Sequence, residues 1–314
     1  MHIPDGFLST GVTTATWIAA ATGVAAALRA ERADPHTMPS GILGATAAFL
    51  FAAQLINVPI APGVSGHLVG GALAAALLGP WRALVAMSVV IAMQAVLFQD
   101  GGITALGANI VDMGVAGVSA GYAVMAITTR WWKSPSGFGV GIVVGAFAAT
   151  LAASVLTGLW LGLSGIYPVG AIVQIMLVTH VPIGVLEAAL TGAVLVTVLR
   201  WRPDLVRGLN ADRPVSHPVV AVVGILGVAA ALAAFVAPFA SALPDGLEYA
   251  ARSLGFAARE QAAWTAPMAG YGLPLATTGR VATGIAGTLG TLAVAALAWI
   301  IGRSLDAHTH AVHR

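Results

Sequence analysis

Long apolar runs, separated by short polar or glycine- and proline-rich breaks, dominate the pattern of this chain. An α-helix needs about 20 mostly apolar residues to cross the hydrocarbon core of a bilayer. Nine segments meet or approach that length. They lie near residues 11–29, 39–57, 66–80, 82–99, 104–128, 138–163, 168–199, 215–240 and 281–302. The pattern therefore predicts an all-α, polytopic membrane helix bundle, in which the third span is short and rich in Gly and Ala.

The basic residues predict how this bundle is oriented, because Lys and Arg gather on the cytoplasmic side of a membrane. With the N-terminus outside and the C-terminus inside, 11 of the 14 basic residues are cytoplasmic. The exceptions, Arg252, Arg259 and Arg280, lie in or beside one long external loop at 241–280. The polar break at 200–213 predicts a seven-span domain over 1–213 and a second domain over 214–314, with two spans flanking that loop.

Composition then narrows the classes of function. Hydrophobic residues make up 58% of the chain and charged residues 8%, whereas soluble domains carry about 25% charged residues. The absence of cysteine excludes disulfides, thiolate metal sites and cysteine catalysis. The only lysine, Lys133, follows no phosphate-binding glycine loop, so ATP-driven work must come from another subunit. We expect a membrane-embedded protein that is not an enzyme, holds no tightly bound cofactor and binds no nucleic acid.

The N-terminus offers candidate metal chemistry. His2 places three nitrogens within reach of one cation: the terminal amine of Met1, the His2 backbone nitrogen once deprotonated, and the His2 imidazole. The two chelate rings are nearly coplanar, so these donors fill three corners of a square, an arrangement that suits Ni(II) or Cu(II). Pro4-Asp5-Gly6 predicts a turn that could fold the terminus back into the protein. A frayed terminus is the alternative for these residues.

His67 is the only other histidine predicted near the outer membrane face, so it can supply the fourth corner of the square. The surrounding glycines permit close approach of the backbone. Asn109 and Asp112 are three residues apart and share a helical face. They could orient His2 or His67 as hydrogen-bonding partners behind the ligands, and ordinary hydrogen bonds within the bundle explain them equally well.

A second group of polar residues lies inside the predicted seventh span. His180 and Glu187 are seven residues apart and share a face. Ionisable groups inside a membrane are functional candidates, and with Asp112 these two could form the proton relay of a secondary transporter. A structural pair around Pro182 is the alternative.

Four stretches carry a family resemblance. They are MHIPDGFLS at 1–9, SGHLVGG at 65–71, QDGGITALGAN at 99–109 and THVPIGVLE at 179–187. Together they closely resemble the CbiM/NikM family, the substrate-binding (S) subunits of cobalt and nickel energy-coupling-factor (ECF) importers, over about residues 1–205. Residues 214–314 resemble the CbiN/NikN-like partner, here fused, and PDGLE at 244–248 matches the signature of that domain.

The resemblance implies a divalent ion bound by the terminal amine, the second residue and one further histidine, which correspond to Met1, His2 and His67. It also implies a membrane coupling subunit (T component) and cytoplasmic ATPase subunits as partners. We therefore expect a nickel-binding subunit in a bacterial or archaeal plasma membrane. Co2+ is the alternative ion, and a proton-coupled secondary metal transporter is the alternative class. The segment 241–280 is expected to cover the site or help to load it.

Overall fold

The computed structural model describes residues 1–34, 38–209, 214–273 and 279–312. Within this part of the chain, all regular structure except one two-stranded hairpin is helical. Seven helices are long and apolar enough to cross a membrane, which confirms an all-helical polytopic bundle. The orientation of the termini stays a prediction.

The elements follow one another in a simple order. The longer helices are α1 (Thr10–Ala33), α2 (Ser40–Gln54), α3 (Gly71–Leu78), α4 (Pro80–Met93), α6 (Gly117–Trp131), α7 (Pro135–Leu163), α8 (Val169–Trp201), α9 (Pro218–Ala231), α10 (Gly246–Ser253) and α11 (Arg280–Val312). The hairpin pairs β1 (Val58–Ala61) with β2 (Val64–Gly66). The short elements are α5 (Leu106–Asn109), η1 (Gln94–Phe98), η2 (Ile110–Ala116), η3 (Pro203–Leu205), η4 (Leu232–Val236), η5 (Ala237–Phe239), η6 (Ala257–Arg259) and η7 (Ala269–Tyr271).

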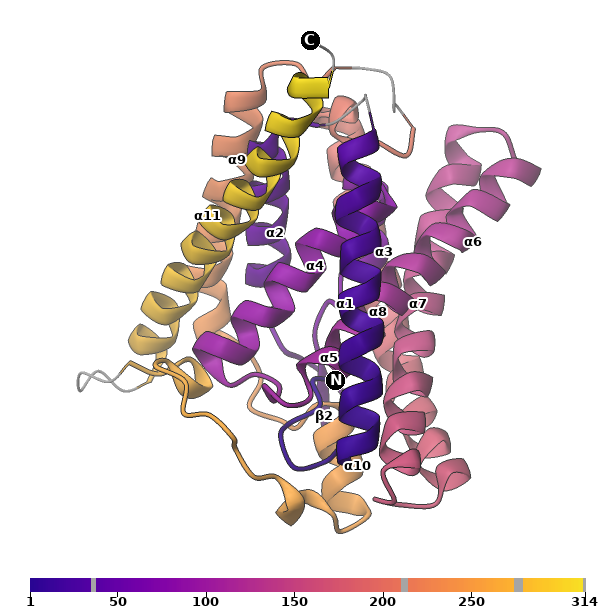
Figure 1. The fold of residues 1–314 in the computed structure, drawn as a ribbon, viewed down its shortest axis with the longest axis vertical. Coiled ribbons are helices and arrows are strands. Elements are labelled where there is room, and N and C mark those ends of the chain that lie inside the picture. Colours follow the sequence, from indigo (N-terminus) through magenta and orange to yellow (C-terminus); the bar gives the residue numbers. More distant parts are fainter. Residues whose placement is uncertain (35–37, 210–213, 274–278, 313–314) are drawn as a thin grey trace.

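The helices form two flanks around a buried centre (Figure 1). On one flank α7 packs between α6 and α8, and on the other α2 packs against α9 and α11. Helices α3 and α4 lie between the flanks, and α1 packs along α4 and α5. Helix α1 begins at a Ser9 N-cap and buries only 17% of its most apolar stretch, so most of its surface is open.

Two of the nine predicted spans form shorter helices. The segment at 39–57 becomes the 15-residue α2, and the segment at 66–80 becomes α3, an eight-residue helix buried along its whole length. Gly79, with φ 78°, ends α3, and Pro80 starts α4. Non-helical backbone at membrane depth is tolerated where protein surrounds it. The third apolar run is therefore a core helix whose neighbours replace lipid.

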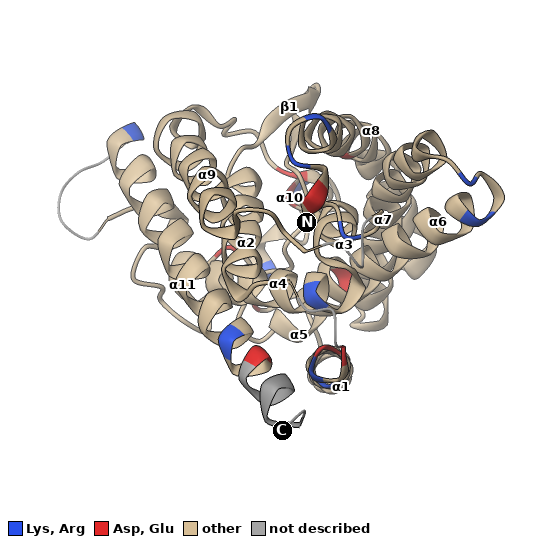
Figure 2. Ribbon diagram, turned by 90° about the horizontal axis from the view of Figure 1, so that it is seen from above, with Lys and Arg blue, Asp and Glu red and all other residues tan. Residues whose placement is uncertain are grey.

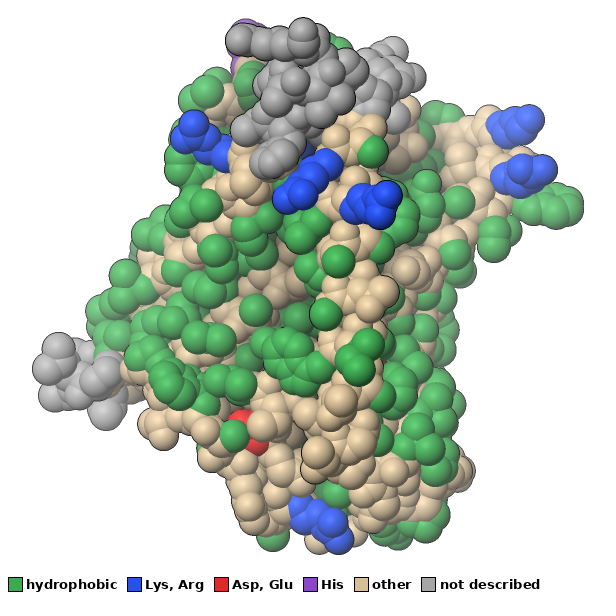
Figure 3. Space-filling model, viewed as in Figure 1, with side chains coloured by type: hydrophobic (Ala, Val, Ile, Leu, Met, Phe, Trp, Pro, Cys, Tyr) green, Lys and Arg blue, Asp and Glu red, His purple; other side chains and the backbone are tan. Residues whose placement is uncertain are grey.

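The outer surface is apolar along the sides of the bundle. Large side chains such as Ile18, Val178, Val219 and Phe235 are more than half exposed, at 63%, 66%, 73% and 75%. Lys, Arg, Asp and Glu occupy only short stretches of the ribbon in Figure 2. Most basic side chains in the view of Figure 3 lie near the end that carries the C-terminus. An apolar belt between charged ends is the surface of a multi-pass membrane protein.

Candidate metal-binding site

The first residues of the chain are inserted into the end of the bundle opposite the C-terminus (Figure 1). Met1, Ile3 and Phe7 are 4%, 0% and 2% exposed. The Ile3 backbone N–H donates to Asn109 Oδ1 at 2.8 Å, and Asn109 Nδ2 donates to the Ile3 carbonyl at 3.1 Å. One amide side chain thus holds both the N–H and the carbonyl of Ile3. The N-terminus is an ordered segment in this structure, not a frayed one.

The predicted turn at Pro4-Asp5-Gly6 is present and is held by the Asp5 carboxylate. Asp5 Oδ1 accepts hydrogen bonds from the Thr104 backbone N–H at 2.7 Å and the Thr104 hydroxyl at 2.5 Å, and Asp5 Oδ2 accepts one from the Ala263 N–H at 3.0 Å. A Cβ at Gly102 would lie 2.3 Å from the Asp5 nitrogen, so only glycine fits there. The turn thus joins the N-terminus to two loops that are distant in sequence.

The His2 ring is buried and held by a chain of polar side chains. His2 Nε2 lies 3.0 Å from Gln94 Oε1, and Nδ1 lies 3.2 Å from Asp100 Oδ1. Gln94 Nε2 donates to Gln54 Oε1 at 2.7 Å, and Gln54 Nε2 donates to the Val69 carbonyl at 2.7 Å. Burial is the main cause that lowers the pKa of His2. The chain of amides links His2 to the loop that follows His67.

His67 lies beside His2. The two ring centroids are 5.6 Å apart and the planes are inclined by 21°. His67 Nδ1 lies 2.9 Å from the Leu68 carbonyl, a contact in which the nitrogen donates, so Nε2 keeps its lone pair. Burial lowers the pKa of His67 to about 4. The imidazole is therefore neutral at neutral pH, the form that binds metal ions.

The terminal amine of Met1 lies on the other side of this pair and contacts the carboxylate of Asp245, from the N-terminus of α10. Burial raises the pKa of Asp245, but the charge and the hydrogen bond of the amine, together with the hydrogen bond from the Glu248 N–H, outweigh burial and hold the pKa below its ordinary range. Asp100 shows the same balance, because burial raises its pKa and the charge of His2 helps to lower it.

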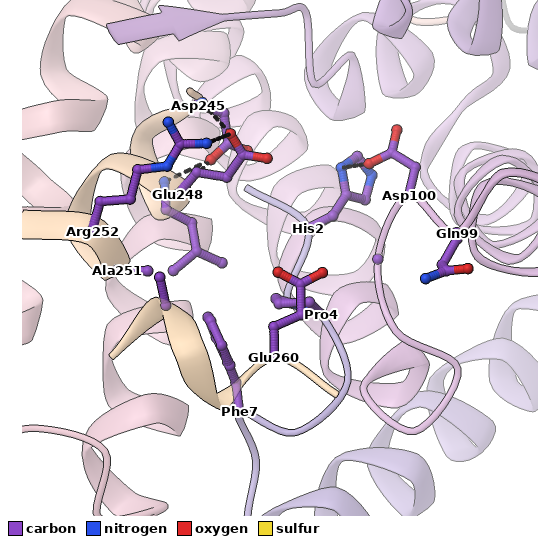
Figure 4. A pocket seen from close by; sticks show the side chains of 13 residues that line it. His2, Pro4, Phe7, Gln99, Asp100, Asp245, Glu248, Ala251, Arg252 and Glu260 are labelled. Carbon is purple, nitrogen blue, oxygen red and sulfur yellow. Dashed lines mark hydrogen bonds and ion pairs between the residues drawn. The ribbon is translucent and has the colours of Figure 1, made fainter. Parts of the chain in front are cut away.

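A cavity of about 160 Å³ lies next to these groups (Figure 4). His2 and Asp100 project from one side and Asp245 from the other, with Glu248 and Glu260 also on its wall. Arg252 is the only basic residue among the lining residues. A cavity with this excess of carboxylates attracts cations.

Comparison with known proteins shows the family of the chain. The family model for the CbiM cobalt-uptake substrate-specific transmembrane region matches residues 2–205. The chain belongs to the CbiM family. A PDGLE domain matches residues 220–307, which confirms the predicted fusion of a CbiM/NikM-like region with a CbiN/NikN-like domain. The predicted boundary between 213 and 214 stays a prediction, and residue 213 lies outside the described residues.

Relatives of this CbiM-family chain include proteins named as nickel transporters and proteins named as cobalt transporters. It is 33% identical to the putative fused nickel transport protein NikMN of Archaeoglobus fulgidus over 96% of this chain and 98% of that protein. It is 34% identical to the cobalt transport protein CbiM of Geobacter sulfurreducens over 75% and 71% of the two chains. The crystal structure of a truncated transition metal transporter matches with a TM-score of 0.56 and 29% identity, covering 64% of this chain and 99% of that one. The chain is thus a multi-pass subunit of the cobalt and nickel transport family rather than an enzyme.

The structure brings Met1, His2 and His67 of the CbiM region together, as the sequence predicted. Asn109 reaches the backbone next to His2, but Asp112 turns the other way and accepts hydrogen bonds from Thr157 and Trp160 of α7 at 2.9 and 2.7 Å. Across the described residues, no three His, Asp or Glu side chains are placed to hold a metal ion.

The intramembrane residues His180 and Glu187 have separate partners. Glu187 accepts hydrogen bonds from the Val69 and Gly70 N–H groups at 2.5 and 2.8 Å, just after His67. His180 Nδ1 lies 2.7 Å from the Met176 carbonyl, and its buried Nε2 has no hydrogen-bond partner in the described part of the chain. With Asp112 bonded to α7, the proposed relay residues form no continuous hydrogen-bonded chain among the contacts that the structure records.

Sequence reasoning missed several residues that arrange the site. Gln54 and Gln94 stand alone inside apolar segments, and Asp245 lies far along the chain. An isolated amide in an apolar helix is a detectable signal, because buried polar groups need hydrogen-bond partners. The pairing of Asp245 with Met1 has no local sequence signal.

Proposed function

We propose that this protein is the substrate-binding subunit of an energy-coupling-factor importer, and that it binds Ni2+ through the Met1 amine, the His2 backbone and imidazole nitrogens, and His67. The observation that carries the proposal is the buried meeting of Met1, His2 and His67 at one end of the bundle. Two imidazoles and an amine beside a carboxylate-lined cavity suit a divalent cation that prefers nitrogen ligands.

Nickel is favoured over cobalt because a planar four-nitrogen site suits the d⁸ ion. Copper(II) binds such a site at least as strongly by intrinsic affinity, so availability or the rigidity of the site must exclude it. Co2+ remains the alternative substrate, and the names of the relatives divide between the two ions. The ion is cargo, so no resident cofactor is proposed.

The partners would be a membrane coupling subunit and cytoplasmic ATPase subunits. Helix α1 supports the first, since its small residues Ala15, Ala19, Ala21 and Ala25 are exposed. Small residues at this spacing allow close approach of another helix. A proton-coupled secondary transporter is less well supported, because Asp112, His180 and Glu187 are each held by separate neighbours.

Metal content tests the proposal directly. The protein is purified from cells supplied with nickel, cobalt and copper, and its metals are measured by mass spectrometry beside a His2→Ala variant. We expect about one nickel per chain, lost in the variant, as for ligand removal from a metal site. A wild-type chain without metal would contradict the nickel site. Uptake that persists in cells without the ATPase subunits would instead favour the secondary transporter.

A further inference from the structure

The PDGLE stretch packs directly against the CbiM region. The Ser65 N–H on β2 donates to the Pro244 carbonyl at 2.8 Å, and the Ser65 hydroxyl donates to the Leu243 carbonyl at 2.6 Å. A Cβ at Gly246 would lie 2.5 Å from Cε1 of the His180 ring, so the ring and the glycine backbone are in close contact. These contacts fix the start of α10 against β2 and α8.

The same stretch fixes the carboxylate of Asp245. Asp245 Oδ1 caps α10 by accepting hydrogen bonds from the Leu247 and Glu248 N–H groups at 2.8 and 2.9 Å. Glu248 Oε2 accepts one from the Asp245 N–H at 3.3 Å, which completes a capping box. Because Oδ1 is used within the helix, Oδ2 points outward and meets the terminal amine of Met1.

The rest of the segment encloses the N-terminus. Leu247 is buried in one apolar cluster with Ile3 and Phe7, and the Phe7 ring meets the edge of Phe256 at 5.2 Å. The Tyr271 hydroxyl donates to Asp100 Oδ2 at 2.6 Å, and the other oxygen of Asp100 faces His2. The C-terminal unit (residues 218–312) therefore touches the amine directly and the His2 ring through one carboxylate.

We propose that Asp245 is a positioning residue for the metal site, which orients the terminal amine as a ligand; this rests on the function proposed above. A primary amine that binds a cation through its lone pair keeps two N–H groups, and one of them can still donate to Asp245 Oδ2. Metal ligands are commonly held by a hydrogen bond to a carboxylate behind them, and loss of that partner typically costs about 10–100-fold in metal affinity. The CbiM region then supplies the nitrogen ligands, and the fused C-terminal unit supplies the carboxylate that orients the terminal amine.

Substitutions at Asp245 separate this role from helix capping. Serine caps a helix about as well as aspartate, but its short side chain does not reach the amine. Asparagine keeps the oxygen that caps α10 but turns its NH2 group, a donor, toward the amine, so the cap stays and the acceptor for Met1 is lost. Ser134→Ala is the control, since it removes the N-cap of another helix, α7, where the Ser134 hydroxyl accepts a hydrogen bond from the Gly137 N–H at 3.1 Å, and Ser134 does not line the cavity beside His2.

The experiment is a competition titration of nickel on the full-length chain in detergent. We expect nickel affinity to fall about 10–100-fold in Asp245→Ser and in Asp245→Asn, and to stay close to wild type in Ser134→Ala. The absorption band of bound nickel should shift in both Asp245 variants and not in Ser134→Ala. Thermal unfolding of the ion-free proteins reports whether capping survives.

The outcomes separate the two proposals. If wild type binds nickel, loses it in His2→Ala and keeps both affinity and spectrum in a folded Asp245→Ser protein, the role of Asp245 is overturned and the metal site stands. If the serine variant fails to fold, Asp245→Asn decides: a shifted nickel band with weakened affinity supports the role, and an unchanged protein overturns it. A wild type that binds no nickel removes the proposed function and this role together.

Discussion

Among the described residues, two ion pairs join the C-terminal unit to the CbiM region, Met1–Asp245 at one end of the molecule and Arg82–Asp306 at the other. At the end carrying the N-terminus, the Met1 amine meets Asp245. At the other end the Arg82 side chain, 0% exposed, lies between Glu31 of α1 at 2.6 Å and Asp306 of α11 at 2.9 Å, and it also donates to the Met38 carbonyl.

The two pairs differ in what they can do. A guanidinium offers only N–H donors and no lone pair, and each of the three guanidinium nitrogens of Arg82 already donates to a protein oxygen. The amine of Met1 sits beside two imidazoles and an adjacent cavity. Both pairs use charge to hold the units together, but among the described residues the Met1–Asp245 pair alone of the two lies beside imidazole nitrogens that can coordinate an ion.

The sharpest test of this contrast extends the chain by one residue before Met1. The extension turns the terminal amine into an amide and displaces the chelate, so nickel binding should be abolished. Metal content and thermal unfolding are measured together, with the same residue added after Arg314 as the control. Retained binding in the N-terminal extension would contradict any role of the amine.

At the end of the molecule that holds Arg82, we expect a substitution to lower the stability of the protein without lowering its nickel affinity. Arg82→Met leaves Glu31 buried without its partner, and breaking a buried pair in this way costs about 3–5 kcal/mol. Denaturant unfolding in detergent should show the loss, while the folded fraction binds nickel as wild type does. The double variant Arg82→Met with Glu31→Leu should recover much of the stability. A lower nickel affinity in the folded variant would show that the Arg82 end also affects nickel binding, and would contradict the difference between the two ends.

Asn109 and Asp112 allow a comparison within the CbiM region. Asn109→Ala removes both hydrogen bonds to Ile3. The Ile3 N–H is left without this partner, which costs about 1–3 kcal/mol of stability. Nickel affinity should also fall, because Asn109 no longer holds the backbone next to His2. Asp112→Asn, equally buried but bonded to α7, should leave affinity unchanged. Nickel titration of the two variants checks these expectations. Equal effects on nickel affinity would contradict the different roles given to Asn109 and Asp112.

The smallest effect is expected at Tyr271. Tyr271→Phe removes the hydrogen bond to Asp100, and a single hydrogen bond contributes about 0.5–1.5 kcal/mol. Nickel affinity should therefore fall by about 2- to 12-fold, at or below the lower end of the loss expected in Asp245→Ser. A larger loss in the phenylalanine variant would place the main influence of the C-terminal unit on His2 rather than on the amine.

Much of the molecule was predictable from local pattern. Apolar runs of membrane length predict helices because lipid forces each helix to satisfy its own backbone hydrogen bonds. The Met1-His2 chelate is also local, since its three nitrogens are joined by a few covalent bonds. His67 was a reasonable partner because it stood alone on the predicted outer side of the membrane. Family membership followed from motifs contained within short stretches.

Only the tertiary structure decided which distant groups meet. The run at 66–80 looks like a span, yet α3 is enclosed by protein and ends at Gly79. Asn109 and Asp112 share a helix face by spacing, but π-helical turns begin at Ile110 and the two side chains bond different segments. The contact of Met1 with Asp245 spans 244 residues. Such pairings depend on how whole helices pack, whereas sequence pattern reports only what neighbouring residues impose on one another.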